Sequence, residues 1–190
     1  MPTSPDDDLV VLLDETGLAM GTHPRATVHH ASTPLHLAFS CYLFDTDGRL
    51  LVTRRALTKR TWPGVWTNAF CGHPRPGETI PDAVRRHGRH ELGVELVDLE
   101  IALPDFRYRA TDANGLVENE VCPVWFATTD DPIRPNPDEV MDLRWVGRAE
   151  LGRAVTAAPW VFSPWMVEQV GQLADRIWAP DDADAPALVH

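Results

Sequence analysis

The most constraining feature of this 190-residue sequence is a stretch from Lys59 to Gly77 that proline or glycine interrupts six times. Proline removes a backbone donor and glycine favours turns, so neither a long helix nor a long strand can occupy the stretch. Long irregular segments that carry histidine and cysteine are usually functional, and both Cys71 and His73 lie in this one. The sequence therefore predicts a loop with a chemical role.

A helix is predicted directly after this loop. Thr79 can act as its N-cap, with Pro81 in the first turn and Asp82 three residues after the cap. Gly93 lies where a left-handed C′ glycine would end the helix. A second, amphipathic helix is predicted to open at Pro164.

Apolar segments on both sides of the first helix predict strands. Leu9–Leu13 is typical of a short buried strand, and Leu37–Phe44 is expected to pair with Leu50–Arg54 across a turn at Asp45–Gly48. Further strands are expected around residues 99–103, 106–109, 118–127 and 143–146. Runs of strands around one central and one terminal helix predict an α/β (α+β) single domain with a mixed sheet between helices.

Composition sets the expected boundaries and excludes several classes of function. The Asp- and Pro-rich ends offer little to bury, so we expect flexible tails at residues 1–8 and 179–190 around a domain spanning 9–178. A net charge of −11 argues against nucleic-acid and anionic-membrane partners. No apolar run reaches the ~18 residues of a membrane span and the N-terminus is acidic, so we expect a cytoplasmic protein.

Three histidines and two carboxylates could share one metal ion. His29, His36 and His73 lie in loop or strand-edge segments rather than on helix faces. Glu118 and Glu120 are two residues apart in a predicted strand, so their side chains point to the same side. Together they offer five ligands to an octahedral Mn²⁺, Mg²⁺ or Zn²⁺, with one position open. Taken singly, each histidine would more often be a surface or hydrogen-bonded residue.

Cys71 is the candidate reactive thiol. It lies beside Gly72, which lets backbone approach closely, and two residues before His73. We expect a nearby cation to lower the pKa of this thiol from about 8.5. Cys41 and Cys122 lie inside strand patterns and are expected in the core. Three cysteines are too few for a disulfide framework.

A set of residues around the predicted helix resembles the Nudix box, a loop–helix–loop that binds a divalent metal and diphosphate: Gly72, Glu78, Arg86, Glu91 and Gly93. Such a helix needs several carboxylates on one face, because Mg²⁺ prefers hard oxygen ligands and must be shared with phosphate. Late in the box, however, His87 and His90 stand where a Nudix hydrolase would carry glutamate, and Glu91 alone remains. The alternative for this helix is a solvated face rich in arginine.

Seven longer runs carry a more specific resemblance: Leu35–Ser40, Arg54–Ala56, Trp62–Asn68, Cys71–Pro74, Phe106–Ala110, Val117–Val121 and Phe162–Met166. They resemble the type 1 isopentenyl-diphosphate isomerases, which belong to the Nudix superfamily. The likeness extends from Val10 to Val170. It implies metal-dependent interconversion of isopentenyl and dimethylallyl diphosphate in isoprenoid biosynthesis, by a 1,3-allylic proton shift through a tertiary carbocation.

The resemblance also implies roles for residues of this chain. Cys71 and Glu120 are the acid/base groups, with Glu120 as acid and Cys71 as base the preferred of two open assignments. One metal is held by the histidine and glutamate set, that is His29, His36, His73, Glu118 and Glu120. Tyr108 is expected to hydrogen-bond Glu120. Trp165 is expected to face the carbocation, because an indole face attracts positive charge, although a tryptophan at a helix start is more often core.

Diphosphate contacts are expected from cations and from a second metal. Arg25, Arg55 and Lys59 are the candidate cations. Glu91 would hold a bridging Mg²⁺, with the Cys71 backbone as a further candidate ligand. Arg25 stands where the family more often has lysine, which preserves charge but alters donor geometry.

Two other functions stay open from the residues alone. One is a Nudix hydrolase that cleaves a nucleoside diphosphate derivative, and it would leave Cys71 without a role. The other is a metal-stabilised binding module without turnover. For the isomerase we expect a small-molecule diphosphate substrate, no macromolecular partner, and a monomer or weak homodimer.

Overall fold

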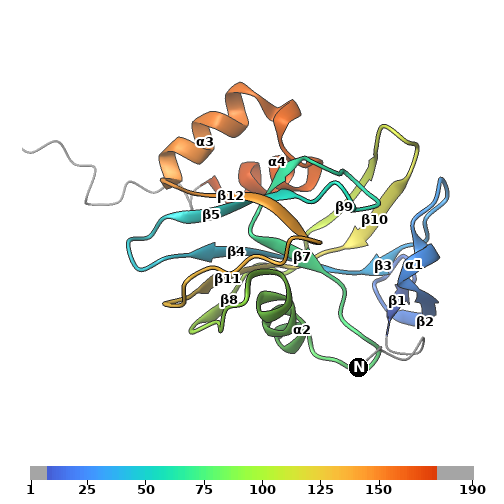
Figure 1. Ribbon diagram of the computed structural model, residues 1–190. Helices are drawn as coiled ribbons and strands as arrows, with labels where there is room; N and C mark the ends of the chain where they lie inside the picture. Colours follow the sequence, from blue (N-terminus) through green and yellow to red (C-terminus); the bar gives the residue numbers. More distant parts are fainter. Residues whose placement is uncertain (1–7, 175–190) are drawn as a thin grey trace, which may run out of the picture.

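The computed structural model describes residues 8–174, and two β-sheets form its centre (Figure 1). The five-stranded sheet has the order β2 (Ala19–Pro24), β1 (Leu9–Leu13), β3 (His36–Leu37), β10 (Val117–Val121) and β9 (Arg107–Thr111). The seven-stranded sheet has the order β12 (Val140–Val146), β5 (Leu50–Arg55), β4 (Phe39–Phe44), β11 (Val124–Thr128) and β8 (Leu99–Leu103), with β6 (Trp66–Thr67) beside β5 and β7 (Phe70–Gly72) beside β4. The pairs β3–β10 and β4–β11 are parallel and the other strand pairs are antiparallel, so both sheets are mixed.

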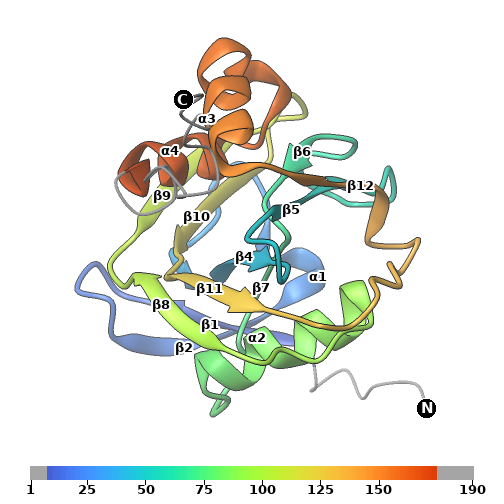
Figure 2. The ribbon, with the colours of Figure 1, turned by 90° about the vertical axis from the view of Figure 1, so that its left-hand side faces the viewer.

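Helices cover the sheets from two sides (Figures 1 and 2). α2 (Ile80–His87) lies on one side and continues as a π-helical turn over Gly88–Leu92. α3 (Arg148–Ala157) and α4 (Pro164–Gln172) lie on the opposite side and are joined by a 3₁₀ turn over Pro159–Val161. This arrangement confirms the predicted α/β (α+β) class with a mixed sheet between helices.

β4 is buried on both faces and divides the core in two. Phe39, Cys41 and Leu43 pack into the apolar cluster under α2. Tyr42 and Phe44 pack into the cluster under α3 and α4. Because side chains alternate along a strand, one continuous apolar run supplies both halves of the core.

The ends of the α2 segment follow the prediction. Thr79 is the N-cap, and its hydroxyl accepts a hydrogen bond from the backbone N–H of Asp82 (3.3 Å). Gly93 ends the segment with φ of 67°, the left-handed conformation that favours glycine. The expected helix from residue 80 to residue 92 is thus present, with its last five residues π-helical.

Two predicted strands are each divided between the sheets. The strand expected from residue 37 to 44 breaks at Ala38, and the strand expected from 118 to 127 breaks at Cys122 and Pro123. In each case the earlier part joins the five-stranded sheet and the later part the seven-stranded sheet. Pro123 has no N–H to donate, which interrupts the ladder there. We call Ala38, Cys122 and Pro123 the sheet junction, and there the Ala38 N–H donates to the Val121 carbonyl (2.9 Å).

The predicted hairpin of β4 and β5 is paired only next to its turn. The strands pair at Phe44 and Leu50 and then diverge, while β6 pairs with β5 and β7 pairs with β4. The stretch predicted as irregular therefore contains two short strands. Their connection enters the interior of the molecule, and Asn68 and Ala69 within it are fully buried.

Besides β6 and β7, two further strands or α-helices longer than one turn were not predicted, β2 and α3, and neither was the short α1 over Arg25–Val28. All of β2 is partly or fully exposed, so it lacks the apolar alternation that identifies a strand. Most of both expected tails, and Trp178 at the expected domain boundary, lie outside the described residues. Asp8 is described, and its carboxylate pairs with Arg25 (2.6 Å). Within residues 8–174, no helix has the length and apolar character needed to cross a bilayer.

Candidate functional site

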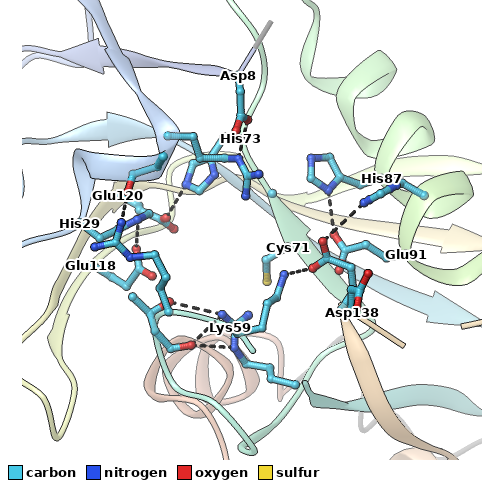
Figure 3. A pocket seen from close by; sticks show the side chains of 18 of the residues that line it. Asp8, His29, Lys59, Cys71, His73, His87, Glu91, Glu118, Glu120 and Asp138 are labelled. Carbon is cyan, nitrogen blue, oxygen red and sulfur yellow. Dashed lines mark hydrogen bonds and ion pairs between the residues drawn. The ribbon is translucent and has the colours of Figure 1, made fainter. Parts of the chain in front are cut away.

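A cavity of about 740 Å³ collects nearly all of the residues singled out in the sequence (Figure 3). It is lined by His29, His73, Glu118, Glu120, Cys71, Tyr108, Trp165, Arg25, Arg55, Lys59 and Glu91. His36 is fully buried behind this lining. The cavity draws residues from both sheets, because at the sheet junction β3 continues into β4, the strand that β7 pairs with.

The histidine and glutamate residues form a compact cluster on one side of the cavity. Single ligand atoms of His29, His36, His73 and Glu120 all lie within 4.8 Å of one another. The Glu120 Oε1 atom is 3.1 Å from His73 Nε2 and 3.3 Å from His36 Nε2. Glu118 lies beside this group, with its Oε2 atom 2.7 Å from His29 Nε2. The expected set is thus brought together as four convergent ligands with Glu118 adjacent.

The buried polar atoms of this donor set fit a divalent cation. The Nε2 atoms of His29 and His36 and the Oε2 atom of Glu118 are buried, and their contacts of 2.7 Å (His29 with Glu118) and 3.3 Å (His36 with Glu120) do not have hydrogen-bond geometry within the described residues. Leaving such polar atoms unsatisfied is costly, and a metal ion would satisfy them together. The Nδ1 atom of His36 contacts the Pro34 carbonyl (2.9 Å), which fixes the ring with Nε2 toward the cluster.

The protonation states of His73 and Glu120 suit metal binding. Burial lowers the pKa of His73 to about 4, so its imidazole is neutral at neutral pH and one of its ring nitrogens carries a lone pair. Burial alone would raise the pKa of Glu120, but the imidazoles of His36 and His73 outweigh it and hold that pKa well below its usual range. A neutral imidazole and an ionised carboxylate are the forms in which these side chains act as ligands.

Cys71 points into the centre of the cavity, between the Glu120 cluster and Glu91 (Figure 3). Its Sγ atom donates to Asn68 Oδ1 (3.3 Å) and contacts Ser40 Oγ (3.3 Å). The expected lowering of its pKa is wrong. Burial raises the pKa of Cys71 to about 11, because it outweighs the two hydrogen bonds and the charge of Arg55. The thiol is therefore protonated at neutral pH.

Trp165 and Tyr108 form the apolar wall of the cavity. Trp165 is 3% exposed in the first turn of α4 and belongs to the core cluster as well as the cavity lining. Arg55 lies over its ring, with Cζ 5.5 Å from the centroid. Tyr108 is directly opposite Glu120 in the β9–β10 register, yet it makes no hydrogen bond to Glu120 within residues 8–174. The centroid of its ring lies 5.9 Å from that of Phe106 and 5.7 Å from that of Trp165.

Cations form a further part of the lining. Lys59 pairs with Glu139, and Arg25 pairs with Asp8. The Nη2 atom of Arg55 donates to the Thr61 carbonyl (2.8 Å), which fixes the guanidinium beside the loop. Two of the three candidate diphosphate cations therefore have carboxylate partners that the sequence did not indicate.

Glu91 is buried at the end of the π-helical turn. Its Oε1 atom lies 2.7 Å from His87 Nδ1. Burial would raise the pKa of Glu91, but His87, Lys59 and Arg55 hold it below its usual range. Gly72 is required here, because a Cβ atom at this position would come within 2.3 Å of the His87 ring.

Several residues of the site were missed. Glu139 is 80 positions from Lys59, and Gln169 donates to Ser40 Oγ (2.9 Å) across 129 positions, so no local pattern could identify either. Asn68 lies inside the Trp62–Asn68 run, whose likeness to a family marked the segment without giving this residue a role.

The chain is similar to known proteins over most of its length. The family model of the NUDIX domain matches residues 34–166. A protein from Agromyces mediolanus named isopentenyl-diphosphate Delta-isomerase is 64% identical over 162 residues, which cover 85% of this chain and 79% of that one. A protein of the same name from Clavibacter michiganensis is 58% identical over 163 residues, covering 86% and 84%.

Solved structures show the same fold. The crystal structure of DR0079 from Deinococcus radiodurans matches with a TM-score of 0.67 at 20% identity, covering 86% of this chain and 98% of that one. A MutT protein from Methanosarcina mazei matches with a TM-score of 0.59 at 15% identity, covering 74% and 94%.

Proposed function

The chain belongs to the NUDIX family and, within it, to the type 1 isopentenyl-diphosphate Delta-isomerases, and from this premise we propose how its own residues interconvert isopentenyl diphosphate and dimethylallyl diphosphate. The reaction adds a proton to one alkene carbon and removes another from the far allylic carbon. It needs two acid/base groups, a stabiliser for the tertiary carbocation, a diphosphate site and exclusion of water. The cavity offers a candidate for each.

Cys71 and Glu120 are the proposed acid/base pair. The observation that carries this proposal is the position of Cys71, which points into the cavity between the Glu120 cluster and Glu91. Because the interconversion is reversible, the group that adds the proton in one direction removes it in the other. Each group must therefore be able to hold a proton. In the protein without substrate, the Cys71 thiol is protonated and the Glu120 carboxylate is ionised.

We assign one divalent ion to the histidine and glutamate cluster, that is His29, His36, His73, Glu118 and Glu120. When bound, Mg²⁺, Mn²⁺ or Zn²⁺ supplies a positive charge beside Glu120 and so tunes its affinity for a proton. Tyr108 stands opposite Glu120 on the neighbouring strand, and we propose that it orients that carboxyl group when substrate is present.

Trp165 is the proposed stabiliser of the carbocation. An indole face attracts a desolvated cation by ~2 kcal/mol or more. Trp165 and Tyr108 are both nearly fully buried, so this wall also keeps water from the reactive carbon.

Arg25, Arg55 and Lys59 are the proposed diphosphate ligands, together with Mg²⁺ held by Glu91 and the Cys71 backbone. All of these residues line the cavity. In the free protein Arg25 pairs with Asp8 and Lys59 pairs with Glu139. Diphosphate binding would therefore replace these carboxylates with phosphate oxygens as the partners of the two cations.

We further propose that the protein acts in the cytoplasm on this small molecule alone, as a monomer or weak homodimer. The net charge of −11 supports the absence of a nucleic-acid or anionic-membrane partner. Size-exclusion chromatography with light scattering measures the assembly state.

The direct test is incubation of the protein and Mg²⁺ with isopentenyl diphosphate. An acid-labile allylic product is expected, and it must disappear in Cys71→Ala. Release of phosphate instead would indicate a hydrolase, and an unchanged substrate would indicate a binding module.

A further inference from the structure

Asn68 is a fully buried residue in the turn between β6 and β7, where β4 and β5 diverge. Its backbone carbonyl accepts a hydrogen bond from the Thr53 hydroxyl (3.0 Å). The turn is thus tied to β5, and the Asn68 side chain extends into the space between the strands. Two of its contacts are side chains of the proposed catalytic machinery.

The amide nitrogen of Asn68 fixes the orientation of the group. It donates to the Cys41 carbonyl (3.0 Å) and to the Phe70 carbonyl (2.9 Å). Both of its hydrogens are therefore used by backbone oxygens of β4 and β7. With the amide reversed, its oxygen would face the Cys41 and Phe70 carbonyl oxygens, so the Oδ1 atom must point away from these two carbonyls.

The Oδ1 atom of Asn68 accepts three hydrogen bonds. The donors are Cys71 Sγ (3.3 Å), Trp165 Nε1 (3.1 Å) and Thr67 Oγ1 (2.9 Å). A single buried oxygen thus contacts the thiol from β7 and the indole from α4, although these residues are 94 positions apart.

We propose that Asn68 is a positioning residue that holds the Cys71 thiol and the Trp165 ring in a fixed relation to each other. The inference rests on the proposed function, in which Cys71 exchanges a proton with the substrate and Trp165 faces the cationic carbon. Proton transfer and cation stabilisation act on neighbouring atoms of one small substrate, so both groups must be placed together. Aspartate lacks the two donors, and leucine lacks the acceptor, so neither replaces asparagine here.

The test compares Asn68→Ala with Thr67→Val. The second variant removes a donor to the same oxygen but touches neither Cys71 nor Trp165. We expect Asn68→Ala to lower kcat about 100-fold with KM for isopentenyl diphosphate within about threefold of wild type, because misplacement acts on the chemical step. Thr67→Val should retain kcat within about threefold. Circular dichroism verifies folding. If Asn68→Ala does not fold, Asn68→Ser replaces it, because the serine hydroxyl is too short to accept hydrogen bonds from both Cys71 and Trp165.

Nitrogen-15 labelling of the tryptophans gives a readout that is independent of turnover. The indole N–H resonance of Trp165, assigned with Trp165→Phe, should move upfield in the Asn68 variant and stay in place in Thr67→Val. An unmoved resonance would overturn the inference even if the isomerase activity were established.

Coupling between the two held groups is tested by a double-mutant cycle. In the Trp165→Phe background, which lacks the indole N–H, the loss of kcat on substituting Asn68 should be at least about threefold smaller than in wild type. If substituting Asn68 lowered kcat by the same factor in both backgrounds, the proposal that Asn68 positions Cys71 and Trp165 together would be contradicted. Absence of isomerisation by the wild-type protein would contradict the proposed function instead, while the Trp165 resonance would still report on Asn68.

Discussion

Buried polar side chains next to the cavity contact one another. Ser40 Oγ contacts both Cys71 Sγ (3.3 Å) and Cys122 Sγ (3.4 Å), and the Gln169 amide donates to the same hydroxyl. The two thiols share this partner, but the Cys71 side chain lines the cavity and Cys122 packs in the core. They are therefore a matched pair for testing whether position in the cavity determines the role of a cysteine.

Cys71→Ala should abolish most turnover, whereas Cys122→Ala should retain it. Removal of one acid/base partner lowers a rate by about 10² to 10⁴. Isomerisation rates and thermal unfolding of both variants are the measurements. A Cys71→Ala protein with near-wild-type activity would remove this thiol from the mechanism.

Trp165→Leu tests the carbocation directly. A tertiary-ammonium analogue carries a fixed positive charge where the transient cation forms, so a site built for that cation should prefer it to substrate. Because leucine keeps part of the volume but lacks the ring quadrupole, the analogue should lose ~1 to 2 kcal/mol more binding free energy than the substrate does. Inhibition constants and KM values give the comparison. Equal losses would mean that Trp165 only seals the cavity.

At the scale of elements, one ion pair fixes the loop that carries His73 to α2. The guanidinium of Arg86 donates to both Glu78 carboxylate oxygens (2.8 and 2.7 Å) and also to the His73 carbonyl (3.1 Å). The backbone N–H of Arg75 donates to Glu78 as well (2.8 Å). The Nudix-box spacing of Glu78 and Arg86 thus has a structural role in placing a candidate metal ligand.

Glu78→Gln should lower the free energy of unfolding by about 1 to 2 kcal/mol, since charge-assisted hydrogen bonds are lost. Partial burial would raise the pKa of Glu78, but the bonds to Arg86 lower it below 4.5. The stabilisation is therefore present at neutral pH and is lost as the pH falls below 4.5. Urea unfolding at pH 7 and at acidic pH measures it. Glu95→Gln, at the exposed Arg89–Glu95 pair, is the control and should change little.

Sequence patterns predicted the elements whose ends depend on neighbouring residues, but not features that depend on the assembled fold. The Thr79 cap and the Gly93 end of the α2 segment were identified because both act within a few residues. The division of strands at Ala38 was not, because an apolar run looks the same whether it serves one sheet or two. Most site residues came from motif likeness, but the pKa direction of Cys71 depends on burial, which only the assembled fold determines.

At the scale of the whole molecule, the candidate metal cluster connects distant parts of the chain. His29 follows α1, His36 lies in β3, His73 follows β7, and Glu120 lies in β10. An ion that binds these four residues only when they are assembled stabilises the folded state by mass action. Metal removal should therefore be visible in global stability as well as in activity.

Adding Mn²⁺ or Zn²⁺ to metal-free protein at about 100 times the dissociation constant should stabilise it by about 2.7 kcal/mol, or very roughly 5 to 10 °C in Tm. Glu91→Gln should retain this shift, because Glu91 is assigned to the diphosphate-bridging ion, whereas Glu120→Gln should lose it. Each variant is compared with its own metal-free Tm by calorimetry. Identical shifts and stoichiometries in both variants would contradict the assignment of two separate metal sites.

The sheet junction also determines where the chain can change in length. One inserted residue between His36 and Phe39, or between Glu120 and Val124, would exchange the two faces of the strand that follows. Tyr42 would then turn toward α2 and Leu43 toward α4, and the alignment of Glu120 with Cys71 would be lost. The junction can therefore accept substitutions but not insertions or deletions, whereas the exposed turn around Asp47 can lengthen without reaching the cavity.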